Sequence, residues 1–318
     1  MTKVKHNYFS GKTVVITGST GFIGQRLLFQ LLNETEANIV LVSRSRPNGI
    51  DSTKVTWIQS PLESLSPCKF IEAGVTKVDI VFHLAAYIPK VHTDRNNVDI
   101  IYRANILGTK MLLEALPDSI NKFVFSSTID VYALAGYDRV LDERSALAPT
   151  SLYGASKLFC EYLISTIARQ RSFGCSILRY GHIYGPGEGA YAKLIPVTIR
   201  NLFRGKQPVL YGDGSALRDF LYVDDVVEAT LRAAVNPSKQ MGPLNIVRGE
   251  SVSIANIVTV LTKIIRYNGD VCYLRDKPTG ASFRFDNRAM LSVLGEWKFM
   301  TLRDGLEREV TYFMDLES

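Results

Sequence analysis

Three glycines spaced three residues apart, Gly18, Gly21 and Gly24, follow directly on the β-branched apolar run Thr13 to Thr17. The chain then continues with apolar residues at helical spacing from Phe22 to Leu32. Because glycine has no Cβ, a turn built from these residues lets an anionic group approach the backbone N–H groups and the positive end of the helix dipole. The sequence therefore predicts a strand, a turn that cradles the pyrophosphate of a dinucleotide, and a helix.

The spacing GxxGxxG differs from the GxGxxG fingerprint of dinucleotide-binding turns, and a plain tight turn is the alternative. The apolar strand before the glycines and the amphipathic helix after them favour the cofactor site. We expect six residues of the loop to contact the cofactor: Gly18, Thr20, Gly21, Phe22, Ile23 and Gly24.

Apolar runs of strand length alternate with longer segments of helical period through the first half of the chain. This alternation predicts an α/β fold in which a doubly wound parallel sheet of the Rossmann type carries helices on both faces. The expected strands are Thr13–Thr17, Ile39–Val42, Ile80–Leu84, Phe123–Phe125 and Ser176–Leu178, and the expected helices are Phe22–Leu32, Asn105–Leu116 and Tyr153–Gln170.

The glycine-rich stretch Gly185 to Gly189 is the expected domain boundary. We expect residues 1–184 to form an NADP-binding Rossmann domain and residues 185–318 a smaller α/β lobe that binds substrate. The chain is expected to return to the first domain around residues 219–247. Helices near Tyr191 to Phe203 and Ile254 to Ile265 are predicted in the second lobe.

Charge and cysteine content exclude several partners. The net charge is +6, but the 37 Lys and Arg are scattered among 31 Asp and Glu, so an anionic small molecule is a better partner than nucleic acid. The four cysteines form no CxxC pair, which predicts a reducing cytoplasmic location, and no metal site is expected. The first apolar run is too short for a signal peptide or a membrane span, so neither export nor a membrane anchor is expected.

The end of the second predicted strand bears on cofactor choice. Its sequence LVSRSR supplies Ser43, Arg44 and Arg46 where an acidic residue usually accepts hydrogen bonds from the adenosine ribose. Without a carboxylate to repel it, a 2′-phosphate can pair with the two guanidinium groups. The sequence thus predicts NADP(H) as the preferred cofactor, with NAD(H) as the alternative and solvated surface arginines as the bland interpretation.

The segment YGASK places Tyr153 and Lys157 four residues apart, on one face of a predicted helix. An ammonium group beside a phenol lowers the pKa of the phenol and makes it usable as a proton donor or acceptor. Such a pair is common on ordinary helices. Thr128, at the end of another apolar strand, adds a hydroxyl that can reach the same substrate oxygen, so the three residues together predict an acid/base site.

The sequence resembles the extended short-chain dehydrogenase/reductase family, which comprises the NAD-dependent epimerases, dehydratases and reductases of nucleotide sugars. The resemblance covers nearly the whole chain. It rests on the glycine loop, Thr128, YGASK and four further motifs: HLAA at His83 to Ala86, NILGT at Asn105 to Thr109, YGPG at Tyr184 to Gly187, and GDGSALRDFLYVDDV at Gly212 to Val226.

The resemblance implies a role for each matching residue. Tyr153 is the catalytic acid and base, Lys157 supports it and holds the nicotinamide ribose, and Thr128 orients the substrate oxygen. Relatives dimerise through helices that here include Asn105 to Leu116 and Tyr153 to Gln170, so a homodimer is expected. The resemblance also implies cofactor contacts from Leu84, Ala85, Ala86 and Asn105, and diphosphate binding of a nucleotide sugar by Arg218.

His182 stands where the family commonly has an Asn that touches the sugar-nucleotide phosphate. A His can donate to the same oxygen and can titrate near neutral pH. A merely packed histidine is the alternative.

The two residues after Thr128 narrow the choice of family member. Ile129 and Asp130 occupy positions where 4,6-dehydratases carry adjacent Asp and Glu, which argues against that elimination. The roles open for Asp130 are a substrate-binding acid, as in the Thr-x-Glu pattern of sugar-nucleotide decarboxylases and one dehydratase branch, and a structural carboxylate.

The tail DKPTGASFRFD, Asp276 to Asp286, resembles that of the 4-ketoreductases that make GDP-fucose. Asp130 and Gly187 replace the Cys and His with which those enzymes epimerise the sugar. The resemblance therefore favours NADPH-dependent reduction of the C4 ketone of a nucleotide-linked 4-keto-6-deoxyhexose. The alternatives are a nucleotide-sugar 4-epimerase, then a decarboxylase or dehydratase, or a non-catalytic cofactor-binding sensor.

Overall fold

The computed structural model describes residues 6–47, 49–89, 97–133 and 139–317. Their packing divides the chain into two compact units. The first unit draws on described residues within 1–133, 146–180 and 227–244, and the second on those within 134–145, 181–226 and 245–318. These two units are defined by packing and not by what they bind, so the expected boundary between a cofactor-binding and a substrate-binding domain at residues 184 and 185 stays a prediction.

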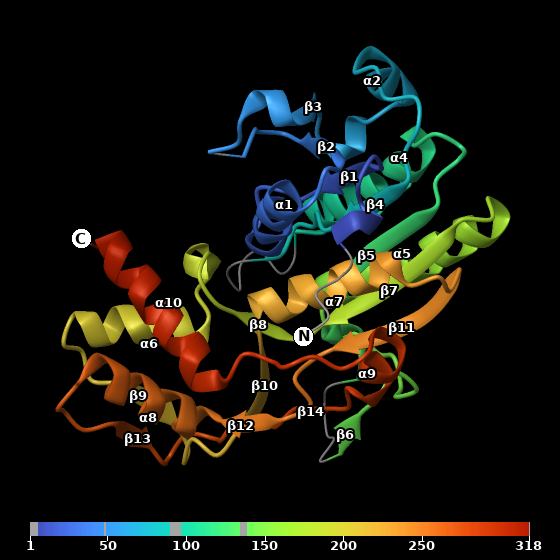
Figure 1. Cartoon of the computed structure of the whole chain (residues 1–318). Helices are drawn as coiled ribbons and strands as arrows, with labels where there is room; N and C mark the ends of the chain where they lie inside the picture. The colour runs from blue at the N-terminus through green and yellow to red at the C-terminus, as the bar shows by residue number, and fades with distance from the viewer. Residues whose placement is uncertain (1–5, 48, 90–96, 134–138, 318) are drawn as a thin grey trace. The chain divides into compact units, whose positions relative to one another are not determined.

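The first unit is built on a seven-stranded sheet with the order β3-β2-β1-β4-β5-β7-β11 (Figure 1). The pairs from β3 to β7 are all parallel. This order is that of the Rossmann fold, which confirms the predicted α/β class with a doubly wound sheet. The strands are β1 (Thr13–Thr17), β2 (Asn38–Ser43), β3 (Val55–Gln59), β4 (Ile80–His83), β5 (Lys122–Thr128), β7 (Gly174–Tyr180) and β11 (Gln240–Ile246).

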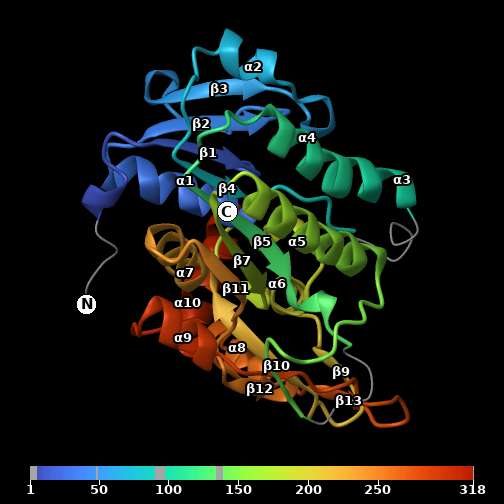
Figure 2. The same ribbon diagram turned by 90° about the vertical axis from the view of Figure 1, so that its right-hand side faces the viewer.

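Helices cover both faces of this sheet (Figure 2). On one face lie α1 (Phe22–Glu34) and α7 (Val223–Val235); on the other lie α2 (Pro67–Glu72), α4 (Gly108–Ala115) and α5 (Leu152–Gln170). Because strand side chains alternate between faces, Val15 packs toward α4 and α5 with Phe123, Phe125, Leu112 and Ile164 in one buried cluster. Burial of these side chains positions the carboxyl ends of β1, β4 and β5, where the predicted motifs begin.

The helix expected over Asn105 to Leu116 has a different form. Residues Tyr102–Leu107 adopt a π-helical turn (η5) between α3 (Val98–Ile101) and α4. The buried Asn105 side chain lies in this turn and forms hydrogen bonds outside its own helix. Wide turns of this kind are rare overall and are frequent at functional sites.

The second unit contains three small sheets and four α-helices among its described residues. The helix predicted over Ile254 to Ile265 is observed with those bounds, and the one near Tyr191 to Phe203 begins at Leu194. The strands are β12 (Ser251–Ser253), β10 (Leu217–Tyr222) and β8 (His182–Tyr184) in one sheet, β13 (Cys272–Leu274) with β9 (Val209–Tyr211), and β14 (Arg284–Phe285) with β6 (Val140–Leu141). The helices are α6 (Leu194–Phe203), α8 (Ile254–Ile265), α9 (Arg288–Leu294) and α10 (Leu302–Glu317), with the short turn η7 (Glu188–Ala190).

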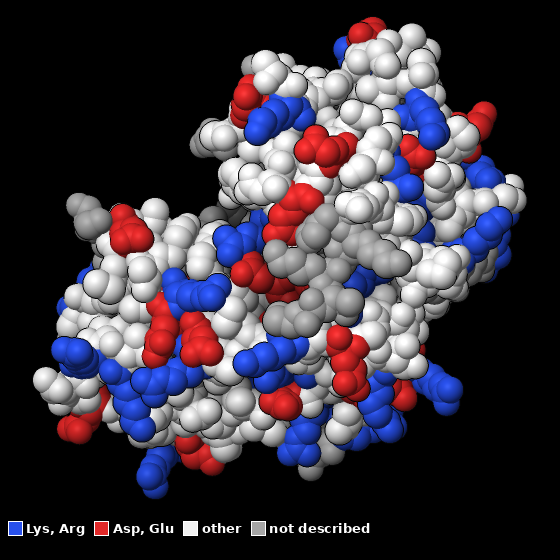
Figure 3. Space-filling view, in the orientation of Figure 1, with Lys and Arg blue, Asp and Glu red and all other residues white. Residues whose placement is uncertain are grey.

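Surface charge is mixed. On the face drawn in Figure 3, basic and acidic side chains are interspersed without a single-sign block. None of the helices in the described ranges has both the length and the hydrophobicity needed to span a lipid bilayer.

Candidate active site

The glycine loop turns tightly against the segment that follows β4. Gly18 has a φ of +74°, and a Cβ on it would lie 2.6 Å from the Ala85 amide nitrogen. A Cβ on Gly24 would overlap the Gly18 carbonyl oxygen. Gly18 and Gly24 therefore have to be glycine for β1, α1 and the Leu84–Ala86 segment to meet this closely.

The start of α1 fits an anionic group. The helix begins after Gly21, which provides no side-chain cap, and its first turn contains no acidic residue. The hydroxyl oxygen of Ser19 is buried in the loop and has no hydrogen-bond partner. An uncapped helix N-terminus with an unpaired hydroxyl matches the pyrophosphate of a dinucleotide. Ser19 was not among the expected contacts, because only its burial reveals it; Thr20 is exposed and Phe22 and Ile23 are partly exposed.

His83 supports this loop from inside. Its Nδ1 lies 2.7 Å from the Thr17 hydroxyl oxygen, and its Nε2 lies 2.9 Å from that of Thr109. The Thr17 oxygen also accepts a hydrogen bond from the Ala85 amide at 3.3 Å. Burial, reinforced by Lys157, lowers the pKa of His83 to about 3, so the ring is neutral.

The residues expected to determine the preference for NADP(H) over NAD(H) lie after β2. The Ser43 hydroxyl donates to the Ser45 carbonyl oxygen at 2.7 Å and accepts from the Trp57 indole at 3.0 Å. The Arg46 guanidinium lies 5.8 Å from the centre of the Trp57 ring. Arg44 is exposed. The loop therefore presents two cations, of which Arg46 lies near the indole and Arg44 is exposed.

Thr128 and Tyr153 are brought to one edge of the first unit by a close helix–strand contact. Thr128 ends β5, and its buried hydroxyl accepts a hydrogen bond from the Asp130 amide at 3.2 Å. At the start of α5, a Cβ on Gly154 would overlap the Asp130 carbonyl oxygen. Gly154, which follows the half-buried Tyr153, therefore lets α5 pack directly on the end of β5. Gly154 is part of the YGASK motif, but its contact with Asp130 was not predicted from the sequence.

Asp130 retains partial access to solvent, and burial raises the pKa of its carboxyl group. No described contact distinguishes the two roles expected for it.

Lys157 lies on α5 one helical turn after Tyr153. Its side chain is buried, and Nζ lies 4.1 Å from the centre of the Phe125 ring. Burial lowers the pKa of Lys157 to about 8, against the opposing effects of Cys160 and Glu161. The amine is thus still mostly protonated at neutral pH, as a group that favours the ionised form of a nearby phenol has to be.

Asn105 is engaged by the protein. Its amide nitrogen donates to the Tyr87 carbonyl oxygen at 3.1 Å and to the Ser156 hydroxyl at 3.0 Å. Its amide oxygen accepts from the Tyr87 backbone at 2.7 Å. These bonds join η5 to α5, so both amide hydrogens are used within the chain, and the cofactor contact expected of this side chain stays a prediction.

A buried ion pair anchors α5 one turn after Lys157. The Arg179 guanidinium donates to both carboxylate oxygens of Glu161, at 3.0 and 2.7 Å. Arg179 also donates to the Tyr132 hydroxyl at 3.0 Å, and the Ser127 hydroxyl donates to Glu161. All members of this network are buried and satisfied, which fixes the α5 backbone that carries Tyr153 and Lys157.

The expected substrate residues His182 and Arg218 belong to the second unit, on the neighbouring strands β8 and β10. The His182 ring packs near those of Phe220 and Phe283, and its Nδ1 has no hydrogen-bond partner. Burial, then Arg218 and Lys193, lowers the pKa of His182 to about 4. The expectation that His182 can titrate near neutral pH is therefore wrong, because the packing and the neighbouring cations disfavour the imidazolium.

Arg218 lies beside a pocket. Its guanidinium donates to the Leu217 and Ala281 carbonyl oxygens, at 2.8 and 2.5 Å, and lies 4.6 Å from the centre of the Phe283 ring. A Cβ on Gly280, which lines the pocket, would lie 3.9 Å from Arg218 Nη2.

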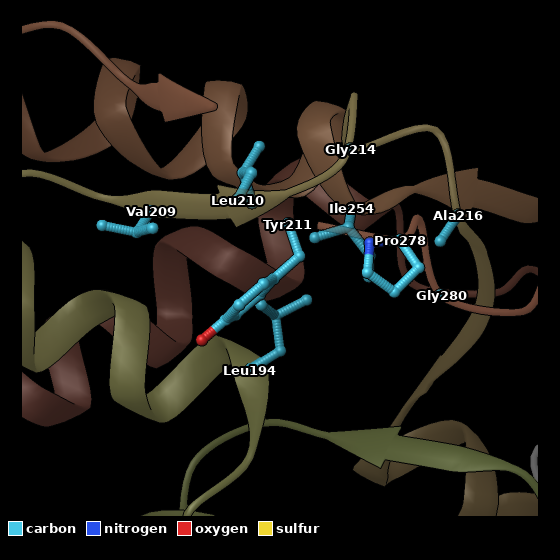
Figure 4. Close-up of a pocket in the computed structure, with 9 residues that line it drawn as sticks. All are labelled: Leu194, Val209, Leu210, Tyr211, Gly214, Ala216, Ile254, Pro278 and Gly280. Carbon is cyan, nitrogen blue, oxygen red and sulfur yellow. The ribbon is translucent and has the colours of Figure 1, made fainter. Parts of the chain in front are cut away.

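The pocket itself was not predicted and has a volume of about 390 Å³. Figure 4 shows the Tyr211 ring extending from β9 toward Leu194, with Ile254 and Pro278 on the other side. Its lining is predominantly apolar, with one exposed aromatic ring, as expected for a site that receives a flat organic group. The remaining lining residues are Val209, Leu210, Gly214, Ala216 and Gly280.

Comparison with known proteins identifies the family and similar folds. The model of the NAD dependent epimerase/dehydratase family matches residues 14–247. An uncharacterized UDP-glucose epimerase of Bacillus subtilis is 29% identical, over 95% of this chain and 98% of its own length.

Two solved structures are similar over 96% of this chain. The UDP-glucose 4-epimerase of Thermotoga maritima, with UDP-glucose, has 25% identity, a TM-score of 0.84 and 100% of its chain covered. The UDP-glucuronic acid 4-epimerase of Bacillus cereus, in complex with UDP-glucuronic acid and NAD, has 27% identity, a TM-score of 0.81 and 99% of its chain covered.

Proposed function

The chain belongs to the NAD dependent epimerase/dehydratase family, enzymes of the extended short-chain dehydrogenase/reductase type, and on that premise we propose that it is a nucleotide-sugar 4-epimerase. The family predicted from the sequence motifs is thereby confirmed. Two of the similar proteins described above are UDP-sugar 4-epimerases and the third is an uncharacterized UDP-glucose epimerase, so the epimerase alternative has more support than plain ketone reduction. The observation that carries the proposal is the close packing of the start of α5 on the residues that follow Thr128, at Gly154, together with the position of Lys157 Nζ 4.1 Å from the Phe125 ring of β5.

A bound nicotinamide supplies the ability to accept a hydride from the sugar C4 and to return it. The chain supplies the proton chemistry. Tyr153 takes the proton of the C4 hydroxyl and later returns it, while the Thr128 hydroxyl holds the same oxygen. In this proposal the positive charge of Lys157 favours the phenolate form of Tyr153.

The second unit supplies nucleotide binding in this proposal. Arg218 pairs with the diphosphate, because a guanidinium fork matches phosphate oxygens. The apolar pocket with Tyr211 receives the base, since an aromatic ring offers a stacking surface to any flat heterocycle. His182, being neutral, adds no charge to the nucleotide site.

A direct test uses purified protein without added cofactor. An epimerase carries its nicotinamide dinucleotide through purification and interconverts UDP-glucose and UDP-galactose. Tyr153→Phe is expected to keep the bound cofactor and to lose turnover by about 10²- to 10⁴-fold. The control is Tyr8→Phe, which removes an exposed phenol outside the site. Turnover of Tyr153→Phe within tenfold of wild type would contradict the assigned acid.

One observation favours a second function, an NADPH-dependent 4-ketoreductase. The segment after β2 offers Arg44 and Arg46 and no carboxylate, which suits a 2′-phosphate. A reductase consumes NADPH in proportion to an added nucleotide-linked 4-keto sugar, and it does not interconvert sugars on its own. Identifying the cofactor that is released when the protein is denatured distinguishes the epimerase from the reductase. Ser43→Asp should weaken NADP binding, because the new carboxylate repels the 2′-phosphate.

The assembly and location that we propose also rest on described residues. Phe159 and Tyr162 on α5 and Tyr102 on η5 are large hydrophobic side chains that remain at least half exposed in the single chain. They suit a homodimer that buries the α3–η5 and α5 surface, to be checked by sedimentation of wild type and Phe159→Glu. The four cysteines are free, which suits a reducing cytoplasm.

A further inference from the structure

Two glutamates of the second unit bring their carboxyl groups together away from solvent. Glu188 begins the turn η7, and Glu309 lies in the middle of α10. Their side chains are 1% and 0% exposed. The two carboxyl groups are in hydrogen-bond contact, which is an arrangement that two carboxylate anions cannot hold.

The surroundings do not supply the donors that two anions would need. Among the described residues, the four carboxyl oxygens lack hydrogen bonds of ordinary geometry, and the backbone donor that faces Glu309 is the Gly185 amide. Lys193 forms an ion pair with Glu188 at 3.2 Å, while its directional hydrogen bond goes to the Ile183 carbonyl oxygen. A single ammonium facing two buried carboxyl groups leaves one negative charge without compensation if both are ionised.

The other polar groups around the pair do not supply the missing charge. The phenols of Tyr184 and Tyr191 have pKa values raised by burial, so they are neutral. The Arg200 guanidinium is directed elsewhere, since it donates to the Gly189 carbonyl oxygen and lies 4.9 Å from the centre of the Phe313 ring.

We propose that Glu188 and Glu309 share one proton and act as a carboxylic acid–carboxylate latch that ties the η7 loop to α10. Glu309 carries the proton and donates to the ionised Glu188, whose charge Lys193 balances. One proton thus gives two of the four oxygens a partner and makes the three-residue cluster neutral. Burial, followed by the charge of Glu188, raises the pKa of Glu309 to about 10, against the opposing effects of Lys193 and the Gly185 backbone.

The latch acts on residues next to the pocket of the second unit. Lys193 is the N-cap residue of α6, and Leu194, the next residue, lines the pocket. The η7 loop leads from β8, which carries His182. Glu309 is therefore a positioning residue in this inference, and the proposal is independent of the reaction assigned above.

The pH dependence of unfolding tests the shared proton. Because the folded chain keeps a proton that the unfolded chain releases above about pH 4.3, the stability due to Glu309 is complete below that pH and is lost as pH rises toward 10. Glu309→Gln keeps the donor but cannot ionise. The folded-to-unfolded ratio of wild type, relative to Glu309→Gln, should fall by up to about tenfold per pH unit between about pH 6 and pH 9.

Infrared spectroscopy gives a readout that a merely structural role would not move. Wild type at neutral pH should show the carbonyl band of a buried, protonated carboxylic acid, which shifts in D₂O and is missing in Glu309→Gln. The matched control is Glu307→Gln on the same helix, where an exposed glutamate pairs with Arg303, and it should leave the band and the pH slope unchanged. Glu309→Ala removes the donor and should be less stable than Glu309→Gln.

Two results would overturn the proposal. A parallel pH dependence of wild type and Glu309→Gln, together with an absent acid band, would mean that the pair holds no shared proton. A rise in the wild-type unfolding midpoint with added Mg²⁺ or Mn²⁺ that Glu309→Gln lacks would mean that a cation lies between the carboxylates instead.

Discussion

Glu161 in the first unit and Glu309 in the second are both buried glutamates on long helices, but they face different partners. Glu161 meets a bidentate guanidinium and a hydroxyl, so each of its oxygens accepts a hydrogen bond. Glu309 meets a second carboxyl group and a shared ammonium. The first unit thus satisfies its buried charge with side chains alone, whereas the second needs a proton from solvent, and the two regions should respond to mutation and to pH in opposite ways.

The largest expected effect is at the satisfied pair. Glu161→Gln leaves the buried Arg179 guanidinium without its counter-charge, which should lower the unfolding free energy by about 3–5 kcal/mol. The measurement is denaturant unfolding at neutral pH, with Glu309→Gln as the comparison. If Glu161→Gln and Glu309→Gln lower the unfolding free energy by the same amount, the proposed difference between the two units is wrong.

A smaller loss is expected where α5 packs on β5. Gly154→Ala places a methyl group against the Asp130 carbonyl oxygen, so the helix has to shift at a cost of about 1–3 kcal/mol. Turnover should fall as well, since Tyr153 moves with the helix. Ala155→Ser, at the exposed neighbouring position, is the control, and a neutral Gly154→Ala would show that the contact is loose.

Lys122 should give the first unit a pH response opposite to that of Glu309. Burial lowers the pKa of Lys122 to about 8, so the unfolded chain binds more protons above that pH. Stability should therefore rise by up to about 1.4 kcal/mol per pH unit from about pH 8 toward pH 10. Lys122→Met should flatten this rise relative to wild type, while Lys110→Met, at an exposed position, should leave it in place.

The smallest effect concerns His182. With a pKa lowered to about 4, the ring stays neutral through the physiological range. Affinity for UDP-glucose, whose two phosphates have no proton to lose here, should change less than about twofold between about pH 5.5 and pH 7.5. Calorimetric titration checks this, and a step near pH 6.5 that His182→Gln abolishes would show that the imidazole ionises.

Local patterns in the sequence predicted the first unit well. The β-branched run before Gly18 gave β1 with its observed bounds, and YGASK gave the position of Tyr153 and Lys157 in α5. These signals lie within a few residues of one another, so hydrogen bonding and side-chain periodicity determine them. The predicted role of each of these residues depends on the proposed reaction and stays to be tested.

Contacts between distant segments were beyond such patterns. Glu188 and Glu309 are far apart in the sequence of the second unit, and no motif near either residue indicates that their side chains meet. The overlap that a side chain at Gly154 would make with Asp130 likewise follows from tertiary packing, and the unpaired hydroxyl of Ser19 is visible only from its burial. Helix propensity over Asn105 to Leu116 gave no sign of the π-helical turn, in which Asn105 forms a side-chain hydrogen bond to the distant Ser156.

The strand order has a consequence for synthesis on the ribosome. The outermost strand β11 is the last to be translated of the seven, and it pairs with β7. Until β11 emerges, β7 presents an unpaired row of backbone donors and acceptors in the nascent chain, with most of the second unit's early segment already made. Chaperone capture, or pairing with another nascent chain, competes with correct closure during that interval.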